Sequence, residues 1–108
     1  MESRSPFLTM QRAEGQIKSL LRSIDIELLE TVERQAIVKL RRLAVDTRLD
    51  IRDYELSETR DEQLKYAAAA KRKLVKLRAV ILSASNAFGP ADVAQISAEL
   101  EQIEDWLR

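Results

Sequence analysis

AAAAKRKLVKLRAVILSASNAFGP, residues 67–90, is the stretch of the sequence that decides the fold. Small and apolar residues recur within it at alternating intervals of three and four, at positions 67, 70, 74, 77, 81, 84 and 88. This spacing is a seven-residue repeat, which is typical of a helix that packs closely against a neighbouring helix. Gly89 and Pro90 then indicate a helix end followed at once by a new helix, because glycine adopts left-handed backbone conformations and proline suits a first helical turn.

A second long helix is predicted upstream, over residues 26–56. Its apolar positions follow an eleven-residue period, which keeps one face aligned along a nearly straight helix, and they are Leu29, Val32, Ala36, Leu40, Leu43, Thr47, Ile51 and Tyr54. Ser57 interrupts this pattern, and Thr59 with Glu62 has the form of a capping box at the start of the next helix, residues 59–88. The two long helices are therefore expected to form an antiparallel hairpin with its turn at residues 56–59.

Shorter amphipathic helices are predicted at the two ends of the chain. Ser5 before Pro6 is typical of a helix start, and Glu14 is the one charged residue in the apolar stripe that follows. Ser23 and Asp25 indicate a break near residues 23–26. The last helix begins at Pro90 and has on one face Val93, Ile96, Leu100, Ile103 and Leu107. The sequence thus predicts an all-α protein, a single domain over residues 1–108, built as an antiparallel bundle of four helices around a long helix hairpin, or of three if the first two are continuous.

The composition agrees with a helical fold. The chain has 108 residues, of which 45% are hydrophobic and only two each are glycine and proline, a profile that favours helix and is too apolar for disorder. Eighteen basic and eighteen acidic residues cancel, so any electrostatic partner must recognise a local patch. Because there is no cysteine, no secretory signal and no apolar run long enough to span a membrane, we expect a cytoplasmic protein.

The absence of histidine bears directly on catalysis. Without histidine or cysteine the chain cannot form the usual nucleophile and base pairs, or the histidine ligand sets of most helical metal sites. Acidic pairs such as Glu27 with Glu30, or Glu101 with Glu104, are interpreted as solvated helix faces rather than as sites for a divalent cation. We therefore expect no enzymatic activity, no cofactor and no metal.

The strongest local charge lies on the third predicted helix. No acidic residue occurs between positions 63 and 91, whereas five basic residues lie close together: Lys71, Arg72, Lys73, Lys76 and Arg78. The following helix is acidic, with Glu99, Glu101, Glu104 and Asp105, so the simpler interpretation is that the two helices match their charges. The alternative is an anion-binding surface for nucleic acid or an anionic lipid surface. It is weakened by zero net charge and by the lack of aromatic residues among the basic ones.

The turn of the long hairpin is the predicted interaction surface. Helices of about 18 residues span about 27 Å, whereas the long helices span about 45 Å, so the end around Ser57 should project. Apolar residues at this end should lack partners within the chain, and the residues expected to contact a second chain, with Trp106 as a further anchor, are Leu49, Ile51, Tyr54, Leu56, Leu64 and Trp106. The sequence predicts a non-enzymatic protein-interaction or oligomerisation module, an adapter or regulatory subunit whose partner is a second copy or a larger protein.

Overall fold

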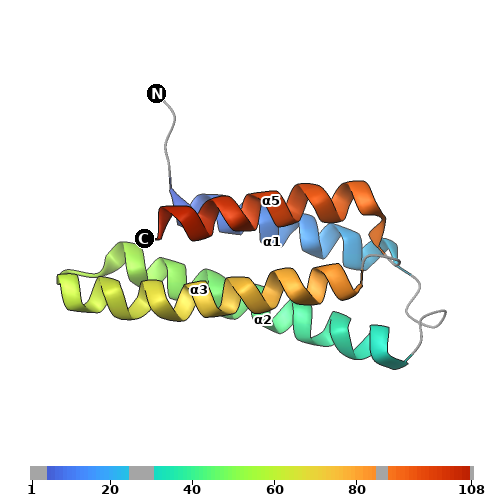
Figure 1. The fold of residues 1–108 in the computed structure, drawn as a ribbon, viewed down its shortest axis with the longest axis horizontal. Coiled ribbons are helices and arrows are strands. Elements are labelled where there is room, and N and C mark those ends of the chain that lie inside the picture. Colours follow the sequence, from blue (N-terminus) through green and yellow to red (C-terminus); the bar gives the residue numbers. More distant parts are fainter. Residues whose placement is uncertain (1–4, 25–30, 85–87, 108) are drawn as a thin grey trace.

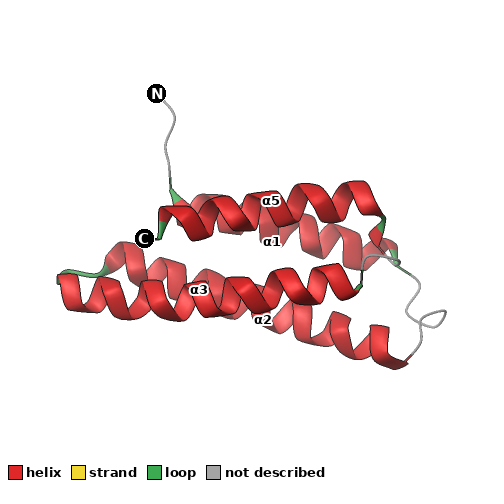
Figure 2. Ribbon diagram, in the orientation of Figure 1, coloured by secondary structure: helices red, strands yellow, loops and turns green. Residues whose placement is uncertain are grey.

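Four α-helices make up the described part of the chain. The computed structural model describes residues 5–24, 31–84 and 88–107, apart from the side chains of residues 32 and 33. The helices are α1 (Pro6–Ser23), α2 (Thr31–Leu56), α3 (Arg60–Ser83) and α5 (Pro90–Trp106). Figure 1 shows α2 and α3 as an antiparallel hairpin, with α1 and α5 lying beside it. Figure 2 shows helix and loop, and no strand, in these residues, so the predicted all-α bundle of four antiparallel helices is confirmed.

The helices pack as a ring around one core. α2 contacts α1 and α3, and α5 contacts α1 and α3. The seven positions predicted at intervals of three and four between residues 67 and 88, which we call the seam, are all buried, with exposed fractions of 6% or less. The five apolar residues predicted for one face of the last helix are buried as well. From α2 the core takes Leu40, Thr47 and Ile51, each 0% exposed. The seven-residue spacing of α3 therefore identified the buried side of that helix correctly.

The predicted helix starts are confirmed by their caps. The Ser5 hydroxyl accepts a hydrogen bond from the backbone N–H of Leu8 at 3.2 Å, and the Thr59 hydroxyl accepts one from Glu62 at the same distance. These bonds satisfy backbone donors that have no partner inside the helix. Gly89, immediately before α5, has a φ of +86°, a conformation that side chains with a Cβ rarely adopt.

α3 ends earlier than predicted, at Ser83 rather than at residue 88. The Ser83 hydroxyl donates to the carbonyl of Val80 at 2.7 Å, and the Ala84 N–H bonds to the carbonyls of Val80 and Ile81. Such local bonds tighten and close a last helical turn. Phe88 is nevertheless buried, so the buried seam extends past the end of α3. The predicted start of α2 at residue 26 lies outside the described residues.

α1 reaches further along the hairpin than the helix lengths suggested. Ser5 Oγ donates a hydrogen bond to Glu55 Oε1 at 2.8 Å, one residue before α2 ends. The prediction that apolar residues near the turn lack partners within the chain is therefore wrong for Ile51, which is 0% exposed. It holds for Leu56 and Leu64, whose exposed fractions are 70% and 51%. The turn itself projects past α1 and α5, as Figure 1 shows.

The other end of α2 is thinly covered among the described residues. Because α1 and α2 are antiparallel, the contact between Ser5 and Glu55 places the end of α1 near Val38. Arg22, near the end of α1, lines a groove together with Val38. Val38 is 71% exposed. The first turns of α2 thus run past the end of α1, an overhang that helix lengths alone did not predict.

Candidate interaction surface

α3 has two apolar faces, one buried and one exposed. Opposite the buried seam, Leu64, Val75 and Leu82 are 51%, 50% and 56% exposed, and Ala68 and Ala79 are exposed between them. At 100° per residue these positions lie within about 60° of one another around the helix, so the side chains form a line about 27 Å long. We call these five residues the outer stripe of α3. Monomeric proteins commonly expose single aliphatic residues, whereas these residues form an aligned row on one helix.

Of the outer stripe, only Leu64 was among the predicted contact residues. The stripe is visible in the sequence as a second apolar set beside the seam, in Val75, Ala79 and Leu82. The seam, whose spacing is regular from residue 67 to residue 88, already accounted for the packing of the helix. The remaining members therefore escaped notice until the packing of α3 was known.

Two of the five predicted basic residues pair with neighbouring helices. Lys73 Nζ lies 2.6 Å from Asp50 Oδ2 on α2. Arg78 Nη2 donates to Glu104 Oε2 on α5 at 2.7 Å, and its Nη1 lies 4.0 Å from Glu101 Oε2. The predicted matching of charges between α3 and α5 is thus confirmed for Arg78, and α2 supplies a further acidic partner that the prediction did not include.

The other three basic residues border the outer stripe. Lys71, Arg72 and Lys76 have no ion pair with any described residue. At 100° per residue, Lys71 lies about 20° outside the stripe on one side, and Arg72 about 20° and Lys76 about 60° outside it on the other. The stripe is therefore a row of aliphatic residues within a positively charged surface.

The remaining predicted contact residues lie in different surroundings. Leu49 is half-buried, and Tyr54 and Trp106 are half-buried and pack against the core. Leu56, at the end of α2, is the most exposed member of the set. Tyr54 and Trp106 thus contribute mainly to closing the bundle, which leaves Leu56 and Leu64 as the fully accessible members.

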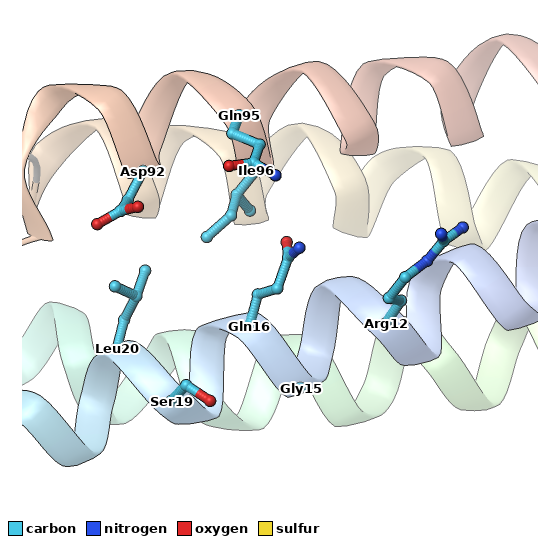
Figure 3. A pocket seen from close by; sticks show the side chains of 8 residues that line it. All are labelled: Arg12, Gly15, Gln16, Ser19, Leu20, Asp92, Gln95 and Ile96. Carbon is cyan, nitrogen blue, oxygen red and sulfur yellow. The ribbon is translucent and has the colours of Figure 1, made fainter.

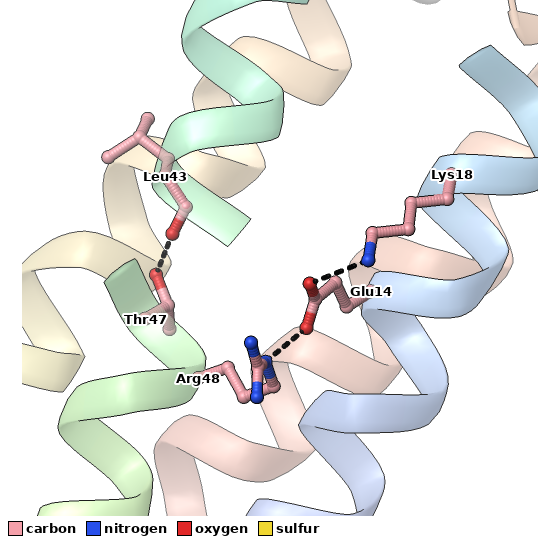
Figure 4. A network of polar contacts seen from close by, with 5 residues as sticks. All are labelled: Glu14, Lys18, Leu43, Thr47 and Arg48. Atoms are coloured by element: carbon pink, nitrogen blue, oxygen red, sulfur yellow. Dashed lines mark hydrogen bonds and ion pairs between the residues drawn. The ribbon is translucent and has the colours of Figure 1, made fainter. Parts of the chain in front are cut away.

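A buried charge joins α1 to α2. Glu14 is 4% exposed; its carboxylate lies 2.5 Å from Arg48 Nε and 3.3 Å from Lys18 Nζ, as drawn in Figure 4. The contact with Arg48 is an ion pair and not an aligned hydrogen bond, because Nε has no hydrogen-bond partner among the described residues. Close by, the buried Thr47 hydroxyl donates to the carbonyl of Leu43 at 2.6 Å. Glu14, the charged exception in the stripe of α1, is therefore a bundle residue with its own cationic partners.

A groove of about 570 Å³ lies between α1 and α5. Figure 3 shows Arg12 and Asp92 toward its two ends, with Gln16 and Gln95 facing each other between them. The lining residues are Arg12, Gly15, Gln16, Ser19, Leu20, Asp92, Gln95 and Ile96. The lining contains no histidine or cysteine, and no group of three potential metal ligands occurs in the described residues.

Gly15, on the floor of this groove, provides a test of the helix assignment. A Cβ added at Gly15 would meet no atom within 4 Å, and the residue lies in the interior of α1. Gly15→Ala should therefore raise the free energy of unfolding by about 1 kcal/mol, because alanine has less backbone freedom to lose. Urea denaturation followed by circular dichroism measures this change. Gly89→Ala is the matched control and should instead lower stability by about 1 to 2 kcal/mol, because φ is +86° at that position. Destabilisation by Gly15→Ala would show that α1 is wrongly placed.

Comparison with known proteins found no family model, no curated protein and no solved structure that matches the chain. None of the helices in the described ranges is both long and apolar enough to cross a membrane. The described residues form an all-α four-helix bundle, and the helix α3 exposes a second apolar face.

Proposed function

We propose that the chain is a non-enzymatic protein-interaction module that binds a partner helix along the outer stripe of α3. The observation that carries this proposal is the alignment of Leu64, Val75 and Leu82, each at least half exposed, along one side of a helix whose opposite side is buried. Covering apolar surface is favourable by roughly 25 cal/mol per Å², so such a row gains most when another chain lies against it.

The shape of the stripe supports a helix as the partner element. Ala68 and Ala79 alternate with the larger aliphatic residues, which leaves space for side chains of a partner between them. Ala68, Val75 and Leu82 are seven residues apart, a spacing that matches the geometry by which two helices interdigitate. Recognition of an amphipathic helix by three or four aligned apolar residues is a common mode of binding.

Binding of nucleic acid or another anionic surface is the second candidate. It is favoured by Lys71, Arg72 and Lys76, which lack ion pairs among the described residues. It is weakened because Lys73 and Arg78 are occupied by Asp50 and Glu104, and because the intervening residues are aliphatic rather than aromatic. A gel shift that weakens steeply with salt and disappears in Arg72→Glu would favour this candidate.

Photo-crosslinking tests the proposed interaction surface. A photoreactive amino acid at position 75 should give crosslinked adducts in cells of the native source, because this position lies at the centre of the outer stripe. The same amino acid at position 8 is the control, since Leu8 on α1 is similarly exposed, at 52%, but lies outside the stripe. Adducts are measured by mass spectrometry. An absence of adducts at position 75, or equal adducts at both positions, would overturn the proposal.

A further inference from the structure

We infer that the partner of the outer stripe is a second copy of the chain, in a two-fold dimer where α3 of each copy packs on α5 of the other. This inference rests on the proposed function and specifies the partner. It follows from the surface that α5 exposes beside the stripe, from the rotation of the two helices, and from the way a two-fold axis would align their charges.

α5 exposes a surface opposite in charge to that of α3. Its exposed side contains the small residues Ala94 and Ala98 together with the acidic residues Glu101 and Asp105. The side chain of Glu101 is 66% exposed, and its contact with Arg78 is long, at 4.0 Å. Small residues would accept the aliphatic side chains of α3, and the acidic surface would lie against the basic one.

The two surfaces lie on the same face of the bundle. α3 and α5 are in contact and lie in front of α2 and α1 in Figure 1. Arg78 and Glu104 meet across that contact at 2.7 Å, which fixes the rotation of both helices. At 100° per residue, Val75 and Leu82 lie about 60° and 40° round from Arg78, and Glu101 lies about 60° round from Glu104. Since these residues are not buried, each set lies on the solvent side of the contact between the two helices.

The register of α3 and α5 favours one symmetry. Because Arg78 contacts Glu104 and Glu101, Lys76 lies level with about residue 105 of the antiparallel α5. A two-fold axis parallel to the helices places α3 of one copy over α5 of the other without changing these levels. Lys76 then faces Asp105 of the second copy. An axis perpendicular to the helices would instead place α3 against α3, with like charges opposed.

The same axis decides which residues form the centre of the interface. Among the outer-stripe residues that lie level with α5, Val75 and Leu82 are nearest the boundary between α3 and α5, so in each copy they lie closest to the axis and contact their own counterparts. Few aliphatic residues are covered in this way, and stable interfaces usually bury more than about 1,000 Å². The dimer should therefore be weak, with a Kd on the order of 10 µM, and should weaken further as salt screens the charges.

Sedimentation velocity measures the self-association. We expect the sedimentation coefficient to rise toward that of a dimer as the protein concentration increases from about 1 to about 200 µM. Leu82→Glu should abolish the rise, because it places two carboxylates together at the axis. Leu8→Glu is the matched control and should leave the rise unchanged, since Leu8 has a similar exposed fraction on another helix. A chain that stays monomeric throughout this range would overturn the inference.

Two further variants test the geometry of the dimer. The chain contains no cysteine, so Leu82→Cys introduces a single thiol that should form a disulfide with its own counterpart under mild oxidation. Leu8→Cys should not. Lys76→Glu and Asp105→Lys should each weaken dimerisation about tenfold, and the combined variant should recover it, because the opposite charges are exchanged. Failure of the Leu82→Cys crosslink, or of the recovery, would show that the dimer uses another arrangement and would overturn the inference.

The proposed function and the dimer fail in different ways. A monomeric wild-type chain that gives adducts of a different protein from position 75 would retain the interaction surface and eliminate the second copy as its occupant. A chain that gives no adduct at position 75 and does not self-associate would eliminate both. Adducts with twice the mass of the chain, together with the Leu82→Cys crosslink, would support both.

Discussion

Leu74→Ala should lower the free energy of unfolding by about 3 kcal/mol. Leu74 is 0% exposed and lies in the seam of α3, which packs against both α2 and α5. Removing a buried leucine side chain costs the transfer free energy of the lost atoms and leaves a cavity, and the sum is typically 2 to 5 kcal/mol. For a domain of this size that loss corresponds to a fall in Tm of about 10 to 20 °C. Urea and thermal denaturation followed by circular dichroism measure both quantities.

Leu82→Ala removes the same atoms from the opposite side of the same helix. Leu82 is 56% exposed, so its truncation in the monomer should change stability by less than about 0.5 kcal/mol. The comparison is made at about 1 µM, a concentration at which a dimer with a Kd near 10 µM is mostly dissociated. Equal losses at the two positions would show that α3 does not have one buried and one exposed face.

Arg48→Met should destabilise the bundle by about 3 kcal/mol, because it leaves the buried carboxylate of Glu14 without its closest cation. The side chain of Glu14 is 6% exposed, so water cannot replace the lost partner. Lys18→Met should cost under about 1 kcal/mol, since Lys18 is 49% exposed and lies 3.3 Å away. Urea denaturation of the three proteins at neutral pH checks the order.

The double variant Glu14→Leu with Arg48→Met separates the cost of a broken pair from the value of an intact one. Buried ion pairs are often no more stabilising than apolar residues of similar size, because both charges lose their hydration. We therefore expect the double variant to recover most of the stability that Arg48→Met loses. A double variant less stable than Arg48→Met would mean that the ion pair itself stabilises the bundle.

The core of the hairpin could be predicted from sequence because its signal is local. Spacing over residues 67–107 identified the buried sides of α3 and α5, and Ser5 and Thr59 identified two helix starts. Each of these features depends on residues within a few turns of one another. The length of α3 was overestimated because the hydroxyl of Ser83 closes the helix while the apolar pattern continues to Phe88.

The features that join distant segments could not be predicted in the same way. Glu14 stood out in its stripe, but its partner Arg48 depends on the register between α1 and α2, which sequence spacing does not fix. The same register brings Ser5 to Glu55 and covers Ile51, a residue that helix lengths had left exposed. The outer stripe was missed for a related reason. Val75 and Leu82 lie outside the seam spacing, and the packing of α3 shows that they form an exposed face of their own.

The order of the helices around the ring has a consequence for folding kinetics. In the described residues α1 contacts α2, α2 contacts α3 and α3 contacts α5, so these pairings follow the chain, whereas the contact of α1 with α5 joins its two ends. Closing a longer loop costs more chain entropy, and such contacts tend to form late. We expect the hairpin of α2 and α3 to form early and the docking of α1 on α5 to limit the folding rate. Amide hydrogen exchange should then be slowest in the centre of α2 and α3 and faster along α1 and α5.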